Sequence, residues 1–233
     1  MEQSFAEKSY EYIRDKLSCG ELPPGKRLVN RALASEIGVS VIPIREAIHR
    51  LVSEGLVIHV PGAGAFVRKA NREDLDNLYV LRDALESCVA AEASRYITGE
   101  QLEELEELLV RAKRDVEEIR KQPQGHSNRQ QLEHWLDDER QFHELLVEAS
   151  RNPLLAKVIN EHRAISNIFD AQRHDPRLLT VRVAEETCRF KAEFLQVLRN
   201  RDASLARKLM SQQIQCGRKM VIEYFKYQKR NQN

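Results

Sequence analysis

The chain has 233 residues, of which 42% are hydrophobic and 31% charged, and its formal net charge is +1. This length and apolar content allow one large domain or two modest ones with substantial cores. Because basic and acidic residues are nearly equal in number, the chain as a whole is not strongly basic. A nucleic-acid-binding function therefore has to be argued from where the charges lie. Residues 1–70 hold ten Lys/Arg and eight Asp/Glu, a net +2, and the remainder is at −1.

The sequence shows no signal for secretion or membrane insertion. The first residues are charged and amphipathic, without the apolar stretch of a signal peptide. No later run approaches the ~20 apolar residues of a membrane-spanning helix. The four cysteines are scattered, without the two-residue spacing that metal sites favour. We therefore expect a cytoplasmic protein with reduced thiols and no membrane partner.

Up to about residue 70, glycine and proline divide the chain into short elements. Apolar residues recur at three- and four-residue steps between Ala6 and Leu17, which predicts a first helix. Asn30 is expected to cap a short second helix that runs through Ile37 and that Gly38 closes.

A third helix is expected to begin after Ser40, which would be its N-cap. Pro43 lies in the first turn, where its missing N–H costs nothing. One face carries apolar residues at helical spacing, namely Ile44, Ala47, Ile48, Leu51 and Val52. Two β-rich runs, 56–60 and 65–68, then flank a glycine-bearing turn and predict a hairpin. This order predicts a winged helix-turn-helix domain over residues 1–70.

The geometry of such a domain indicates which residues would face DNA. The third helix would lie in the major groove, and Arg45, on its side away from the apolar face, could reach a guanine edge or a phosphate. Arg31 would meet the backbone, and Gly62 and Gly64 would allow close approach of the wing to a phosphate or the minor groove. The alternative is a winged domain used for protein contacts, with Arg45 a solvated surface charge.

From residue 72 onward the sequence has long helical periods and few breakers. The expected helices are about 72–97, 99–122, 128–150, 152–173, 178–200 and 202–228. Thr98 is expected to cap the second of them, and Pro153 lies just inside the fourth. The predicted fold class is therefore mainly α: a winged helix-turn-helix with a small β-hairpin, followed over residues 71–233 by an all-α bundle of six helices.

Over about residues 8–68, the first domain resembles the DNA-binding domain of GntR-family transcription regulators. The residue types in the turn, the third helix and the wing agree with that family, and so does their spacing. The resemblance implies DNA contacts from Arg31, Ser40, Arg45 and Gly62. The family usually has an Arg-Thr pair after the turn serine, whereas here Val41 and Ile42 follow and precede Pro43. We expect readout to shift towards apolar contacts with thymine methyl groups.

Residues 72–228 resemble the effector domain of the FadR-type, or FCD, branch of that family. The resemblance is carried by the stretches Leu81-Arg82-Asp83-Ala84-Leu85-Glu86, Asn152-Pro153-Leu154-Leu155 and Arg201-Asp202-Ala203. Six helices would place it with the shorter type of these domains. Many of them hold a divalent metal through a carboxylate or Asn, a His one turn later and two further His. The matching positions are Glu139, His143, Lys191 and Gln213.

Two of these four positions do not suit a metal. Glu139 and His143 share a helix face as ligands could, but the ammonium of Lys191 has no lone pair and Gln213 is a poor ligand. We therefore predict no metal and no cofactor, with Lys191 standing in place of the cation and paired with Glu139. His143 is otherwise a core histidine, and a rearranged metal site with His162 is a further alternative.

The resemblance also implies that Arg82 helps to hold an effector carboxylate, since a planar guanidinium suits a carboxylate. Arg163 could lie near it. The alternative for Arg82 is a pair with Glu86 within one helix.

We predict a DNA-binding transcription regulator, a repressor on the resemblance, that binds a palindromic operator in double-stranded DNA as a homodimer and responds to a small effector such as a carboxylate. A constitutive DNA-binding dimer with a degenerate effector pocket is the alternative. The sequence contains no Gly-rich phosphate loop, nucleophile elbow or paired Cys/His set, so we do not expect an enzyme.

Overall fold

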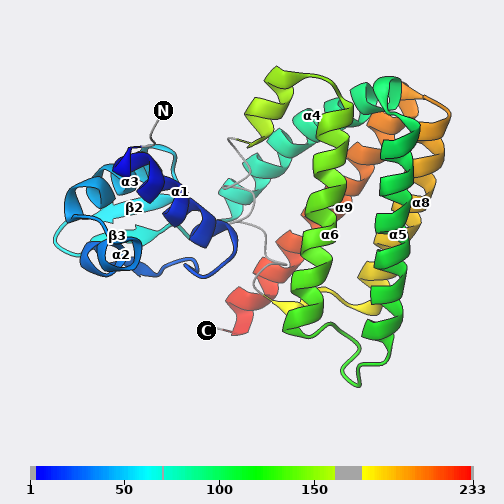
Figure 1. The fold of residues 1–233 in the computed structure, drawn as a ribbon. Coiled ribbons are helices and arrows are strands. Elements are labelled where there is room, and N and C mark those ends of the chain that lie inside the picture. The colour runs from blue at the N-terminus through cyan, green and yellow to red at the C-terminus, as the bar shows by residue number, and fades with distance from the viewer. Residues whose placement is uncertain (1–3, 70, 161–174, 232–233) are drawn as a thin grey trace. The chain divides into compact units, whose positions relative to one another are not determined.

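The computed structural model describes residues 4–69, 71–160 and 175–231. The described residues fall into two compact units, one up to Asn71 and one from Arg72 onward. Both are built mainly of α-helices, and the first also contains a small antiparallel sheet of three strands (Figure 1). The predicted fold class is confirmed.

In the first unit, three helices pack around the small sheet. Its elements are α1 (Phe5–Ser18), β1 (Arg27–Leu28), α2 (Asn30–Ile37), α3 (Val41–Ser53), β2 (Val57–Val60) and β3 (Gly64–Val67). Helix α1 packs against α3, and the fully buried side chains of Ile13, Leu17, Ile44 and Leu51 lie in this core. The apolar face predicted for α3 is therefore the face that holds the helix on its domain.

The start of α2 differs from the expectation. Val29 is the N-cap and Asn30 is the first helical residue, so the prediction that Asn30 caps this helix is wrong. The physical reason is the preceding strand: Leu28 of β1 pairs with Ala65 of β3, which keeps the chain extended up to Val29. Strand β1 was not predicted, because two residues become a strand only through a partner far along the chain.

The turn between α2 and α3 agrees with the sequence prediction. Gly38 has a φ of 76°, in the left-handed region that favours glycine, and its N–H donates to the carbonyl of Ala34 at 2.9 Å. Ser40 is the N-cap of α3, although its side chain makes no capping hydrogen bond. Helix α3 therefore begins with Val41 as its first residue.

The predicted hairpin is present as β2 and β3, which pair from Val57 with Val67 to Val60 with Gly64. The N–H of Ala63 donates to the carbonyl of Val60 at 3.0 Å, and Gly62 has a φ of 75°. Proline followed by a glycine with positive φ is typical of a type II turn. This turn forms the tip of the wing.

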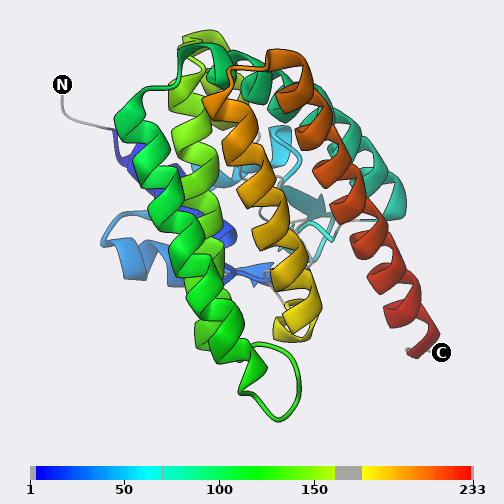
Figure 2. The ribbon, with the colours of Figure 1, turned by 90° about the vertical axis from the view of Figure 1, so that its right-hand side faces the viewer.

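The second unit is all-helical. Its elements are α4 (Arg72–Tyr96), α5 (Gly99–Arg120), α6 (Arg129–Ala149), the 3₁₀ turn η2 (Pro176–Leu178), α8 (Val181–Arg199) and α9 (Ala203–Asn231), and residues 153–160 are helical as well. Helix α4 packs against α9, and α5 packs against both α6 and α8 (Figure 2). The helices agree with the predicted ranges to within a few residues. The later part of the predicted helix 152–173 lies outside the described residues.

Helix ends in this unit are satisfied by specific side chains. Thr98 caps α5 as predicted, in a capping box in which its hydroxyl accepts from the N–H of Gln101 and the Gln101 side chain accepts from the N–H of Thr98. The guanidinium of Arg201 donates to the carbonyl of Arg95, in the last turn of α4, and to that of Ile97, just after the helix. These carbonyls have no partner within their helix, so the arginine ties α4 to the turn before α9.

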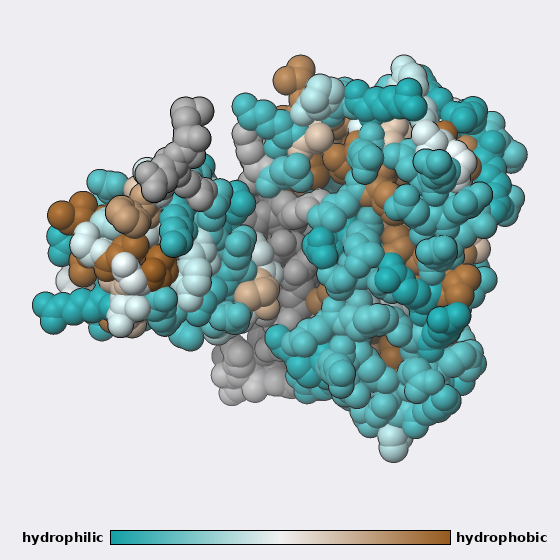
Figure 3. Space-filling model, viewed as in Figure 1, coloured by the Kyte–Doolittle hydropathy of each residue, from teal (hydrophilic) through white to brown (hydrophobic). Residues whose placement is uncertain are grey.

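The surface of the helical unit is mostly hydrophilic on the face formed by α5 and α6 (Figure 3). Among the described residues, no helix combines the length and the apolar character needed to cross a membrane.

Helix α5 offers a matched test of the core. Leu105 is fully buried, whereas Val110 on the same helix is 48% exposed. We expect Leu105→Ala to lower the free energy of unfolding by about 2–5 kcal/mol, because it leaves a cavity. Val110→Ala should change it by about 0.5 kcal/mol or less. Urea unfolding followed by circular dichroism measures both, and equal costs would contradict the packing described here.

Candidate DNA-binding cleft and buried charge cluster

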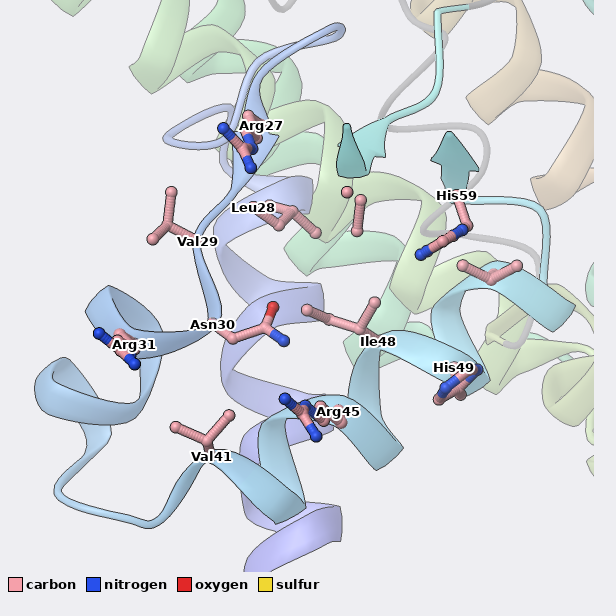
Figure 4. A pocket seen from close by; sticks show the side chains of 13 residues that line it. Arg27, Leu28, Val29, Asn30, Arg31, Val41, Arg45, Ile48, His49 and His59 are labelled. Atoms are coloured by element: carbon pink, nitrogen blue, oxygen red, sulfur yellow. The ribbon is translucent and has the colours of Figure 1, made fainter. Parts of the chain in front are cut away.

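A cleft of about 490 Å³ opens on the first unit, and thirteen residues line it. They come from β1, the start of α2, one side of α3 and the two hairpin strands (Figure 4). Its side chains include three arginines, Arg27, Arg31 and Arg45, and two histidines, His49 and His59. No aspartate or glutamate is among the thirteen. The cleft is therefore a cationic surface on a unit whose net charge is close to zero.

The packing of α3 explains why its basic side chains face this cleft. Ile44, Ala47 and Leu51 point into the core, and Arg45 and His49 are exposed on the other side of the helix. Because a helix turns by 3.6 residues, fixing the apolar face fixes the direction of both basic side chains.

Some other cations of the unit pair with carboxylates, whereas the three arginines of the cleft have no such partner among the described residues. Lys16 pairs with Glu36 at 2.9 Å, and Arg50 pairs with Glu7 at 2.8 Å. Within the described part of the chain, Arg27, Arg31 and Arg45 form no ion pair or hydrogen bond through their side chains, and all three are exposed. Their guanidinium groups are available to an external anion such as a phosphate.

The residues predicted for DNA contact divide into two sets. Those that line the cleft are Arg31, Val41, Arg45 and Gly64. Those that lie outside its lining are Ser40, Ile42, Pro43 and Gly62. Ile42 is 67% exposed at the tip of α3, and Gly62 is exposed at the tip of the wing. A Cβ on Gly64 would lie 3.5 Å from Nε of Arg27, so this glycine sits directly beside the arginine.

Sequence reasoning missed three basic residues of the cleft. Arg27 lies on β1, whose position depends on pairing with β3. His59 lies on β2, where alternation along the strand could have placed it only if the buried face were known. His49 is four residues after Arg45, so helical spacing alone could have placed it on the same side.

In the helical unit, a buried ion pair joins α8 to α6. Nζ of Lys191 lies 2.6 Å from Oε1 of Glu139. The Lys191 side chain is 1% exposed and that of Glu139 is 24% exposed. The ammonium also lies 4.5 Å from the centre of the Phe142 ring, within the range of a cation–π interaction. A buried ammonium needs such partners, because its desolvation is costly.

This geometry does not fit a metal at the positions that the resemblance indicates. The ammonium of Lys191 has no lone pair to donate, and it would repel a divalent cation next to Glu139. Gln213 lies half-buried on α9. The residues present therefore favour an internal ammonium over a bound ion at this place.

A second set of charged groups lies beside the first. Nε of Arg82 lies 2.7 Å from Oε1 of Glu86, one turn further along α4, so the structure contains the intrahelical pair that the sequence left as an alternative. Nδ1 of His143 lies 3.8 Å from Oε2 of Glu86. Burial lowers the pKa of His143 below its ordinary value, and the carboxylates of Glu86 and Glu139 oppose this shift. Arg163 and His162 lie outside the described residues.

Two protein families match this chain. Residues 5–67 match the family described as bacterial regulatory proteins, gntR family, and residues 77–215 match the FCD domain. The first match covers the unit with the cleft, and the second covers most of the helical unit.

Similar proteins of known role are bacterial transcription regulators. The chain is 36% identical over 112 residues to the HTH-type transcriptional regulator McbR of Escherichia coli (strain K12), a stretch that spans 46% of this chain and 51% of McbR. It is 25% identical over 213 residues to the HTH-type transcriptional repressor RspR of the same strain, across 91% of this chain and 87% of RspR.

Solved structures share the fold over nearly the full chain. The structure of E. coli McbR/YncC has a TM-score of 0.76 at 23% identity and covers 96% of this chain and 100% of that one. A GntR transcriptional regulator from Rhodococcus sp. RHA1 has a TM-score of 0.72 at 19% identity and covers 95% and 99%. At these identities the likeness concerns the fold.

The buried pair predicts unequal costs for removing its two partners. Glu139→Gln should lower the free energy of unfolding by about 3–5 kcal/mol, because it leaves the buried ammonium of Lys191 without its countercharge. Lys191→Met should cost less, about 1–3 kcal/mol, because the partly exposed carboxylate can be hydrated. Urea unfolding measures both, and the double variant should cost less than the sum of the two. Additive costs would show that the two charges are not coupled.

Proposed function

The chain belongs to the GntR family of bacterial transcription regulators, in the branch with an FCD domain, and from this we propose that it is a repressor that binds a palindromic operator as a homodimer. It acts in the cytoplasm, and a small effector changes its affinity for the operator. The name of the relative RspR, a transcriptional repressor, supports the repressing role. Membership of a family of transcription regulators also argues against an enzyme.

The observation that carries the DNA-binding proposal is the cleft with its three arginines, whose side chains have no ion-pair or hydrogen-bond partner among the residues that the structure describes. Arg45, on the exposed side of α3, reads a base edge or holds a phosphate when the helix enters the major groove. Arg31, on α2, and Arg27, on β1, contact the backbone on either side, where they fix the register of the domain on the duplex.

The apolar start of α3 supports a different kind of base contact. Ile42 is 67% exposed at the tip of the helix, and Val41 lines the cleft beside it. In the major groove these side chains offer methyl groups to thymine rather than hydrogen bonds to guanine. Ser40, at the N-cap, and Pro43 fix the start of the helix that presents them. The wing, with Gly62 at its exposed tip and Gly64 beside Arg27, approaches the adjacent backbone.

For the effector, the proposal places the site at the charged cluster of the helical unit. Its residues are Arg82, Glu139, His143, Lys191 and Gln213, and the sequence adds Arg163, which lies outside the described residues. A carboxylate effector would have to compete with Glu86 for Arg82, since the two are 2.7 Å apart in the free protein. Such an exchange would release Glu86, which lies 3.8 Å from His143 of α6, and so would link effector binding to the contact between α4 and α6.

One observation favours a second candidate, a constitutive DNA-binding dimer without an effector. Lys191 lies beside the carboxylate of Glu139, and Arg82 beside that of Glu86, so the charge of each cation is balanced without any ligand. We expect this charge balance in an effector site that has lost its ligand, because no ligand charge is then required.

The DNA-binding proposal predicts that Arg45→Ala weakens operator binding. The operator is first obtained by selecting bound sequences from random double-stranded DNA. On that sequence, loss of Arg45 should cost about 1–3 kcal/mol, or roughly 5- to 150-fold in Kd, because a base or phosphate contact is removed. Fluorescence anisotropy at fixed salt concentration measures the change.

The matched control is Arg50→Ala, which removes the same charge from the same helix at a residue paired with Glu7 and Glu54. It should leave Kd within a few-fold of the wild type. The groove assignment is wrong if Arg45→Ala binds as well as wild type, or if both variants lose affinity equally.

The effector proposal predicts that one of a set of small carboxylates raises the melting temperature of the wild-type protein and changes its Kd for the operator. Stabilisation is expected because a ligand that binds only the folded state shifts the unfolding equilibrium. Arg82→Ala should abolish the thermal shift. If no carboxylate stabilises the protein, the constitutive candidate stands in its place.

A further inference from the structure

A cluster of three potential metal ligands lies between α5 and α6. Asp115 comes from α5, and His134 and Asp138 come from α6. One ligand atom from each residue lies within 4.8 Å of the other two. His134 and Asp138 are four residues apart, so they share a face of their helix. None of the three belongs to the Lys191 and Glu139 pair or to the set that the family resemblance indicates.

The buried member of this cluster has an unsatisfied oxygen. The side chain of Asp138 is 3% exposed, and its Oδ2 has no hydrogen-bond partner among the described residues. Its other oxygen, Oδ1, lies 3.4 Å from Nη2 of Arg111, which is too long for a strong hydrogen bond. A buried carboxylate oxygen without a donor is costly, so this carboxyl group needs either a proton or a cation.

The distances within the cluster suit a small divalent ion. Nδ1 of His134 lies 3.0 Å from Oδ2 of Asp115. Ligands about 2.0–2.2 Å from a tetrahedral zinc ion lie roughly 3.3–3.6 Å apart, so this pair would have to separate by a few tenths of an ångström, and the Asp138 ligand atom lies within 4.8 Å of both. An imidazole with two carboxylates is a donor set for Zn²⁺ and similar first-row ions, whereas Mg²⁺ and Ca²⁺ prefer oxygen ligands throughout.

The exposure of the three residues gives the ion a route of entry. Side-chain exposure is 55% for His134 and 17% for Asp115, compared with 3% for Asp138. The ligands therefore run from solvent into the interface between the helices. Arg111 offsets one of the two carboxylate charges, which keeps the attraction for a divalent ion moderate.

We propose that Asp115, His134 and Asp138 form a binding site for a divalent transition-metal ion such as Zn²⁺, with water in the fourth position, and that the ion fastens α5 to α6. In the free protein, burial raises the pKa of Asp138, an effect that Arg111 opposes. Loading the ion releases any proton that this carboxyl group holds, because the ligand must be ionised.

The test is titration of the full-length, chelator-treated protein with Zn²⁺ in competition with a chromogenic chelator, and with Co²⁺ followed by visible absorption. We expect one ion per chain, a d–d absorption typical of a low-coordinate cobalt site and a rise in melting temperature with Zn²⁺. Asp138→Asn and His134→Gln should each weaken binding at least tenfold. The matched control, Glu133→Gln, changes an exposed residue next to His134 that pairs with Arg129, and it should bind as the wild type does.

Three outcomes would overturn the proposal. The first is a wild-type protein that binds no ion at micromolar concentrations. The second is equal affinity in the wild type, Asp138→Asn and His134→Gln. The third is loss of the ion in Glu139→Gln with retention in Asp138→Asn, which would place the ion beside Lys191 instead. If Asp138→Asn fails to fold, His134→Gln still decides the question, because its side chain is largely exposed and its loss does not disturb the core.

Discussion

Burial of charge is the constraint on which the helical unit depends. The ammonium group of Lys191 is 1% exposed, and the carboxylate of Glu139, 2.6 Å away, together with the Phe142 ring offsets the cost of its desolvation. The pair fixes the facing sides of α6 and α8, since neither helix can rotate without exposing one charge or stranding the other. At the positions where the family resemblance implies a metal, the chain itself supplies a cation, the ammonium of Lys191 beside Glu139.

One residue away from this pair, the same constraint has a different outcome. Asp138 is buried almost as deeply as Lys191, but the guanidinium of Arg111 lies near only one of its two oxygens, and the other has no hydrogen-bond partner among the described residues. A bound ion or a proton would remove the free-energy cost of burying the second oxygen without a hydrogen-bond donor. Adjacent residues on α6 therefore differ in how their charge is balanced. Glu139 pairs with Lys191 of the same chain, whereas we propose that Asp138 binds a divalent ion.

The first unit shows the opposite arrangement. Arg27, Arg31 and Arg45 remain exposed and unpaired within the described residues, whereas Lys16 and Arg50 are held by glutamates. An exposed guanidinium costs little without a partner, because water solvates it, and it gains strongly from a phosphate. The small net charge of the chain thus conceals a local cationic surface. In the proposed complex with DNA, specificity would rest with the few groups at the tip of α3, where Val41 and Ile42 carry methyl groups.

The sequence by itself determined the helices, the helix-turn-helix frame and the hairpin, because periodicity, Gly38 and the wing turn act through residues close together in the chain. It also predicted the pairing of Lys191 with Glu139, from the family resemblance and the cost of an unpaired buried charge. The third strand, the places of Arg27 and His59 in the cleft, and the meeting of Asp115 with His134 were decided by tertiary structure alone. Each of these joins segments distant in sequence, and no local pattern encodes the register or the crossing of helices that brings them together.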